Sequence, residues 1–265
     1  MTTAYAPGSV TTVFVPRSDP AEGSLGVSFA VEDGVRATVE PADETTVRLD
    51  GSTTAFEPVA GVLDRLGVTA AVSLSADAPV GRGFGASGAA TLATALAVVA
   101  EFDLDADRED ALEAAHRAEV TAGTGLGDVF VQDVGGFVWN TGDGRDRTER
   151  TDRIEYSSMG DIATRDVLDD ESAVANVADA GTETLSAFHP GDSLQAWFEA
   201  SWASRSEPNC RRRPSNGRSN ASSTPAARRR WRWWVRRCWR RASTASSTRR
   251  RASRTRALTC CRHRK

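Results

Sequence analysis

Cysteine and lysine are missing from the first 203 residues of this chain. They occur only later, at Cys210, Cys238, Cys260, Cys261 and Lys265. Without cysteine, this first part can hold neither a disulfide framework nor a cysteine-based zinc site. The longest apolar stretch, residues 89–100, is too short and too rich in alanine and threonine to cross a bilayer. The start, MTTAYAPGSV, lacks the basic segment of a signal peptide, so we expect a soluble cytoplasmic protein.

Positive charge is also scarce before Ser204. This part carries 12 basic residues, all of them arginine, against 35 acidic ones. From Ser204 onward the balance reverses, with 21 basic residues and a single acidic one, Glu207. A large negative charge without lysine is similar to the surfaces of proteins adapted to a high-salt cytoplasm, where salt screens the self-repulsion. We therefore expect a halophilic, archaeal protein.

The tail, residues 204–265, differs from the rest in pattern as well as in charge. Segments such as RRRWRWWVRRCWRR have neither helical nor strand periodicity and almost no Leu, Ile or Val. One interpretation is a basic, aromatic arm that binds nucleic acid. The other is a frameshift in a GC-rich gene, because the codons around residues 224–235, read in another frame, permit a phrase like DAGGAASMAMVG. A functional arm has no reason to conceal such a phrase, so we favour the frameshift, a disordered tail and no nucleic-acid partner.

A glycine-rich loop precedes a helix at residues 79–90, PVGRGFGASGAA. Glycines at every second position leave no side-chain bulk between a ligand and the backbone N–H groups. Ser87 opens a helix whose first N–H groups are unpaired and whose amino end is positive. The segment therefore predicts a phosphate site. Its expected members are Pro79, Gly81, Gly83, Phe84, Gly85, Ala86, Ser87, Gly88 and Ala89.

Three other interpretations of this loop are weaker. A dinucleotide fold needs GxGxxG directly after a strand and an acid at the end of a second strand, but Pro79 intervenes and residues 102–104 are too short for that strand. A GxSxG nucleophile elbow would need one more residue, and neither His116 nor His189 has a clear aspartate partner. A purely structural loop of three glycines would cost entropy without a ligand.

Two carboxylates follow the loop. Leu112, His116 and Glu119 share one face of the next predicted helix, and a carboxylate facing the core needs a cation or a proton. Glu119 could alternatively pair with an arginine such as Arg117 or Arg82. The run GTGLGD then carries Asp128 to the start of a predicted strand. We expect Ser87 and Glu119 to bind Mg²⁺ and Asp128 to orient and deprotonate a hydroxyl that attacks the γ-phosphate of ATP.

The periodicity predicts an α+β fold. We expect strands at residues 4–15 (interrupted at Pro7-Gly8), 26–31 and 35–40 (a hairpin around Asp33-Gly34), 47–49, 70–76, 129–134, 137–139 and 161–168. We expect helices at residues 56–66, 87–101, 108–122 (capped by Asp107), 172–188 and 193–203. The polar run at 145–153 indicates a boundary. The predicted units are therefore 1–145, 150–203 and the tail, 204–265.

The loop and the second carboxylate motif resemble those of the GHMP kinases, which are named for galacto-, homoserine, mevalonate and phosphomevalonate kinases. In that family Mg²⁺ lies on the serine of the loop and a helix glutamate, and an aspartate precedes a strand ending in Gly-Gly, here Asp128 and Gly135-Gly136. The resemblance implies an ATP-binding domain like domain 2 of ribosomal protein S5, followed by an α+β domain that is incomplete here. It implies an acceptor pocket lined by Pro7, Gly8, Ser9, Gly125 and Gly127. Ser9 stands where mevalonate kinases have lysine, so a lysine-assisted base is excluded.

Among these kinases, four segments are most similar to the archaeal pantoate kinases: APGSVTTVF, PVGRGFGASGAA, AEVTAGTGLGDV and GDIATRDVLDDE. This resemblance implies ATP-dependent phosphorylation of pantoate to 4-phosphopantoate in coenzyme A biosynthesis, and it allows a homodimer. The carboxylate of pantoate predicts an arginine at the pocket, and the sequence does not choose among Arg17, Arg36, Arg82 and Arg165. Homoserine- or mevalonate-type kinases, a nucleic-acid-binding protein and a nucleotide-dependent dehydrogenase are the alternatives. His116 is expected to be a helix-face residue and not a ligand.

Overall fold

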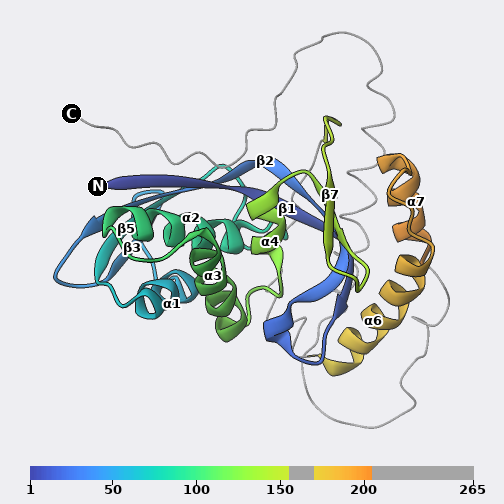
Figure 1. Ribbon diagram of the computed structural model, residues 1–265, viewed down its shortest axis with the longest axis horizontal. Coiled ribbons are helices and arrows are strands. Elements are labelled where there is room, and N and C mark those ends of the chain that lie inside the picture. Colours follow the sequence, from blue (N-terminus) through green and yellow to red (C-terminus); the bar gives the residue numbers. More distant parts are fainter. Residues whose placement is uncertain (155–169, 205–265) are drawn as a thin grey trace.

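The computed structural model describes residues 1–154 and 170–204 (Figure 1). Its strands form one mixed sheet in the order β4-β3-β5-β2-β6-β7, with β1 paired to β2. The strands are β1 (Thr2–Pro16), β2 (Ser24–Pro41), β3 (Thr46–Leu49), β4 (Ser52–Thr53), β5 (Ala70–Ala76), β6 (Phe137–Asn140) and β7 (Arg145–Thr148). The helices are η1 (Pro20–Glu22), α1 (Glu57–Leu66), α2 (Ala86–Glu101), α3 (Arg108–Ala122), α4 (Asp128–Val134), α6 (Glu171–Ser186) and α7 (Leu194–Ser204). The α+β class is confirmed.

The long antiparallel pair β1–β2 is the axis of the fold. Helices α1, α2 and α3 pack together toward one end of this pair, while α6 and α7 lie at the other end (Figure 1). Helix α2 is largely apolar and most of its alanines are buried, so it packs against the sheet and against both α1 and α3 at once. A second cluster, which includes Phe29, Phe137 and Trp197, holds α7 on the sheet, where the Trp197 indole N–H donates to Thr12 Oγ1 at 2.7 Å.

The predicted hairpin around Asp33-Gly34 is wrong, because β2 is one strand of 18 residues. Pro7 pairs with Gly34 and Gly8 pairs with Val31, so the two intervening residues of β2 form a bulge instead of a turn. A Cβ at Gly34 would overlap the carbonyl oxygen of Ala6, which shows how closely the two backbones approach there. Strand β1 offers an extended partner on both sides of the bulge, so pairing continues through a dipeptide that would otherwise reverse the chain.

A further secondary-structure prediction is wrong. Residues 129–134 form helix α4 and not a strand, so Asp128 begins a helix. A short apolar run does not distinguish a buried strand from a buried helix. Residues 145–148, predicted to begin a boundary, form β7, which pairs antiparallel with β6 and extends the sheet to Thr148.

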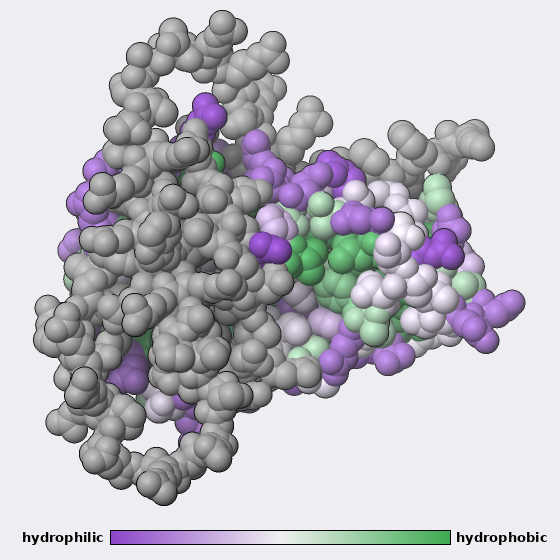
Figure 2. Space-filling view, turned by 180° about the vertical axis from the view of Figure 1, so that it is seen from behind, coloured by the Kyte–Doolittle hydropathy of each residue, from purple (hydrophilic) through white to green (hydrophobic). Residues whose placement is uncertain are grey.

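The predicted interruption of the first strand at Pro7-Gly8 is wrong, because β1 runs without a break from Thr2 to Pro16. The remaining elements are confirmed within the described residues, including the Asp107 cap, whose carboxylate accepts from the N–H groups of Glu109 and Asp110. The strand expected at 161–168 lies outside these residues, as does the tail beyond Ser204. Seen from behind, the described surface has hydrophilic residues along its edges and a smaller hydrophobic area between them (Figure 2). Within the described chain, no helix is both long and apolar enough to span a bilayer.

Candidate active site

The glycine-rich loop lies between the end of β5 and the start of α2, as the sequence predicts. Gly81, Gly83 and Gly85 have φ angles of 72°, 80° and 62°. Residues with a Cβ are strained in this left-handed region, so the loop conformation depends on glycine. Nothing lies within 4 Å of a Cβ added at Gly81 or Gly83, whereas a Cβ at Gly85 would overlap the Ser9 hydroxyl. The first two glycines therefore face open space, and the third packs against the protein.

The segment Pro7–Gly8–Ser9 packs against this loop and supports it. The Ser9 N–H donates to the carbonyl oxygen of Phe84 at 2.9 Å, and a Cβ at Gly8 would lie 2.8 Å from the same oxygen. The Phe84 side chain is buried in the core and anchors the loop. Two motifs far apart in the sequence, at residues 7–9 and 79–89, are thus in direct contact.

Ser87 and Glu119 meet at the start of α2. Ser87 Oγ donates to Glu119 Oε1 at 2.7 Å, and Thr91 Oγ1 lies 3.5 Å from the same oxygen. Glu119 is only 2% exposed, and its second oxygen, Oε2, has no hydrogen-bond partner. A Cβ at Gly125 would lie 2.8 Å from Oε2, so only glycine leaves this oxygen its space. The pair therefore presents a hydroxyl and a buried, half-satisfied carboxylate beside the phosphate loop.

Burial raises the pKa of Glu119 to about 7, and the nearby charge of Asp128 contributes in the same direction, while the hydrogen bonds from Ser87 and Thr91 to the carboxylate act against this rise. The alternative pairing with Arg117 is wrong, because Arg117 Nε binds Glu113 at 2.6 Å. Across residues 1–154 and 170–204, no basic side chain forms an ion pair with Glu119. A carboxylate in this setting holds a proton near neutral pH unless a cation replaces it.

Asp128, the first residue of α4, is the second carboxylate of the site. Thr11 Oγ1 donates to its Oδ1 at 3.4 Å. Burial raises the pKa of Asp128, and hydrogen bonds from Thr11 and Ser9 act in the opposite direction. A Cβ at Gly88 would lie 3.3 Å from Asp128 Cβ, so this glycine lets α4 approach α2. Asp128 consequently lies beside the helix that carries Ser87.

Gln132 is a site residue that the sequence did not reveal. It is 1% exposed, and its Nε2 donates to the carbonyl oxygen of Gly85 at 2.6 Å and to Ser9 Oγ at 3.3 Å. It follows Asp128 by four residues, so in a helix the two lie on one face. The assignment of this segment to a strand hid that relation, and the spacing of four was the signal that could have revealed it.

The remaining residues predicted for the phosphate loop and the acceptor pocket differ in their surroundings. Ala86 and Ala89 are buried, so only their backbone can face a ligand, and Pro79 precedes the turn of the loop. Gly127 packs against Ser24 of β2, where a Cβ would lie 3.8 Å from the Ser24 N. Gly127 therefore has different neighbours from Gly125, which packs against the Glu119 carboxylate.

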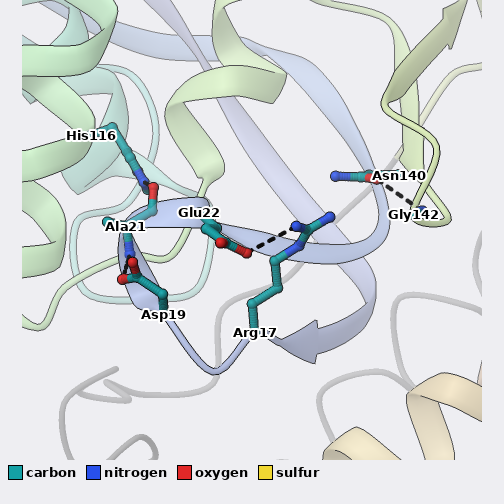
Figure 3. Close-up of polar contacts among 7 residues, drawn as sticks. All are labelled: Arg17, Asp19, Ala21, Glu22, His116, Asn140 and Gly142. Carbon is teal, nitrogen blue, oxygen red and sulfur yellow. Dashed lines mark hydrogen bonds and ion pairs between the residues drawn. The ribbon is translucent and has the colours of Figure 1, made fainter.

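His116 is a buried helix-face residue, as expected. Its Nε2 lies 2.9 Å from the carbonyl oxygen of Ala21, in the turn that also contains the Arg17–Glu22 ion pair (Figure 3). Its ring packs on Phe130 with 4.6 Å between centroids, and burial lowers its pKa. In the part of the chain that the structure describes, no three His, Cys, Asp or Glu side chains cluster as a ready-made metal site.

Comparison of the chain with known proteins identifies relatives. Residues 54–136 match the GHMP kinases N terminal domain. The chain is 30% identical over 191 residues to a pantoate kinase of Methanospirillum hungatei, covering 66% of this chain and 66% of the relative. It is 31% identical over 141 residues to a pantoate kinase of Methanocaldococcus jannaschii, covering 51% of each. The chain thus spans just under two thirds of the first relative and about half of the second.

Solved structures agree on the fold. A phosphotransferase related to the CoA biosynthesis pathway superposes with a TM-score of 0.64 at 24% identity, over 77% of this chain and 74% of that one. The mevalonate kinase of Methanococcus jannaschii superposes with a TM-score of 0.53 at 11% identity, over 76% of each chain. The architecture is therefore that of the GHMP kinases.

The packing of Gly85 predicts a difference between two glycines of one loop. Gly83→Ala should cost about 1–2 kcal/mol of unfolding free energy through its positive φ alone. Gly85→Ala should cost more and should also weaken nucleotide binding, because the new Cβ displaces Ser9. Urea unfolding and nucleotide titration of both variants measure this. Equal effects of the two substitutions would show that Ser9 does not support the loop.

The raised pKa of Glu119 predicts a pH-dependent stability. The folded state favours the protonated acid, so this contribution is complete below the unfolded value of about 4.5 and is lost as the pH rises through about 7. Without metal or nucleotide, the unfolding free energy of Glu119→Gln should rise by roughly 3 kcal/mol relative to that of the unmodified chain as the pH increases between these two values. Urea unfolding from pH 4.5 to 8.5 at fixed salt measures it. Glu113→Gln, an exposed site, is the control, and parallel curves for all three proteins would refute the assignment.

Proposed function

The chain contains a GHMP kinase N-terminal domain, and on that premise we propose that it transfers the γ-phosphoryl group of ATP to the alcohol of pantoate, forming 4-phosphopantoate. Two pantoate kinases at about 30% identity support the choice of acceptor. The observation that carries the proposal is the Ser87–Glu119 pair beside a glycine loop, with Asp128 on the adjoining helix. Phosphoryl transfer needs positioning, charge neutralisation and a group that accepts the hydroxyl proton, and these residues can supply all three.

Ser87 and Glu119 are suited to hold Mg²⁺. The orphaned Oε2 of Glu119 is a hard oxygen with no other partner, and Mg²⁺ on a nucleotide takes few protein ligands. Bound there, the ion would neutralise phosphate charge. Its binding would also ionise Glu119, which the free protein keeps partly protonated. The open backbone at Gly81 and Gly83 would receive the phosphate oxygens.

Asp128 is the group placed to accept the proton of the acceptor hydroxyl. Its raised pKa makes it a stronger base than an exposed aspartate, which suits proton transfer near neutral pH. Thr11 and Ser9 hold the carboxylate in place. The first 203 residues contain no lysine, so no lysine assists this step there. The proton therefore passes from the alcohol to Asp128 as the oxygen attacks.

The division of the chain into units is also a proposal. We propose an ATP-binding unit that extends through β7 to Thr148, a second unit that includes α6 and α7, and a tail from residue 204 that results from a frameshift. The acidic, lysine-free composition supports a halophilic, archaeal, cytoplasmic protein. The homodimer stays a prediction.

The function is tested by ATP-dependent turnover of pantoate, with homoserine and mevalonate as competing acceptors. Asp128→Asn should lower kcat by about 100-fold or more, because it removes the base, while ATP affinity changes little. A coupled ADP assay in high salt with Mg²⁺ measures kcat, and titration measures affinity. Unchanged kcat in Asp128→Asn would exclude its role, and preference for another acceptor would exclude pantoate.

The tail is tested by restoring the reading frame after Ala203 and assaying both forms side by side. We expect the restored form to turn over pantoate faster, because the displaced segment would complete the site. Equal turnover would contradict the frameshift. Salt-dependent DNA binding that disappears when residues 204–265 are deleted would instead support a basic arm.

A further inference from the structure

We infer that Arg145, together with the charge of Arg17, binds the carboxylate of the acceptor. This inference rests on the proposed function, since it assigns the residue that distinguishes a hydroxy acid from a neutral alcohol. The residue lies at the start of β7, in a segment that the sequence indicated only as a boundary.

Arg145 is an exposed residue whose guanidinium is partly covered by an aromatic ring, which holds it in place. Its carbon Cζ lies 3.5 Å from the centroid of the Phe130 ring. The same ring also packs against the imidazole of His116. Within residues 1–154 and 170–204, Arg145 forms no ion pair with a carboxylate. Arg147, two residues further along the same strand, binds Glu149 at 3.3 Å. Arg145 is therefore a fixed, accessible cation whose hydrogen-bond donors are available.

The position of Arg145 relates it to the proposed base. A Cβ at Gly23 would lie 3.3 Å from the Leu126 carbonyl oxygen, 3.6 Å from the Phe130 ring and 4.0 Å from an Arg145 terminal nitrogen. These groups therefore meet at one point. Phe130 also lies 3.6 Å from a Cβ placed at Gly127, the residue that precedes Asp128 at the amino end of α4. Arg145, stacked on Phe130, therefore lies beside the end of α4 at which Asp128 stands, and an acceptor bound at that end of the helix could extend its carboxylate toward Arg145.

A second cation lies close by. Arg17 is near enough that its charge lowers the pKa of Arg145, after the larger effect of burial. Arg17 binds Glu22 at 3.0 Å through one nitrogen, while its buried Nε has no partner (Figure 3). Arg17 and Arg145 repel each other, and within the described residues only Arg17 of the two pairs with a carboxylate, that of Glu22. A bound anion would relieve this repulsion. The planar fork of arginine suits a carboxylate, which it can bind through two hydrogen bonds.

The other arginines considered from the sequence fit less well. Arg36 binds Asp77 at 2.8 Å and lies over the ring of Tyr5. Arg82 belongs to the phosphate loop, and Arg165 lies outside the described residues. Of the arginines considered from the sequence that the structure describes, Arg17 is the one whose charge acts on Arg145.

The test uses the full chain loaded with a non-hydrolysable ATP analogue and Mg²⁺, with the frame-restored form in parallel. Pantoate and its uncharged primary amide are titrated calorimetrically into the unmodified protein, Arg145→Ala and Arg147→Ala. We expect the unmodified protein and Arg147→Ala to prefer pantoate over the amide by about tenfold or more, the usual effect of one charge-assisted contact. Arg145→Ala should lose that preference, and Arg145→Lys should keep part of it.

The inference is overturned if Arg145→Ala binds both compounds as the unmodified protein does. A substitution that merely disturbs the fold weakens both compounds equally and leaves their ratio unchanged, which also overturns it. Failure of the proposed function gives a different result. In that case the full chain and the frame-restored chain, both without substitutions, would bind the ATP analogue but not pantoate.

Discussion

The buried carboxylate of Glu119 is the interaction on which the rest of the site depends. Its side chain lies on α3 with one oxygen bound to Ser87 and the other without a partner. Burying such a group costs free energy unless a proton or a cation compensates for the charge. Near neutral pH a proton compensates for part of this cost, because burial raises the pKa of Glu119 to about 7. A magnesium nucleotide would supply the cation, so binding and ionisation would be coupled at this one residue.

Small residues make this arrangement geometrically feasible. Helices α2, α3 and α4 meet around Glu119, Asp128 and Ser87, and each approach occurs at a glycine. Gly125 leaves space for Glu119 Oε2, Gly88 leaves space for Gln132 and Asp128, and Gly85 leaves space for Ser9. An alanine at any of these positions would press on a polar group of the site. The glycines therefore serve packing between functional side chains as well as backbone freedom in the loop.

Much of this could be predicted from the sequence, because local signals and function coincide in the loop. Glycine spacing, a helix start at Ser87 and a carboxylate on a helix face are all short-range features, and the structure brings these residues together. The errors arose where tertiary pairing overrides a local signal. Asp33-Gly34 is a common turn sequence, yet β1 pairs with β2 on both sides of it. Residues 129–134 are apolar enough for either a strand or a helix, and that ambiguity concealed Gln132 and the true setting of Asp128. Arg145 depends on a long-range contact with Phe130 that no local pattern contains.

The most direct measurement of the central claim is proton release on nucleotide binding. Calorimetric titration of MgATP at pH 7, in two buffers with different ionisation enthalpies, reports the number of protons exchanged. Glu119 has a pKa of about 7 in the free protein and, as we propose, would ionise on holding the cation, so about half a proton should leave the unmodified chain. Glu119→Gln should show no such release beyond that of the nucleotide. The same heat in both buffers for the unmodified chain would contradict the account.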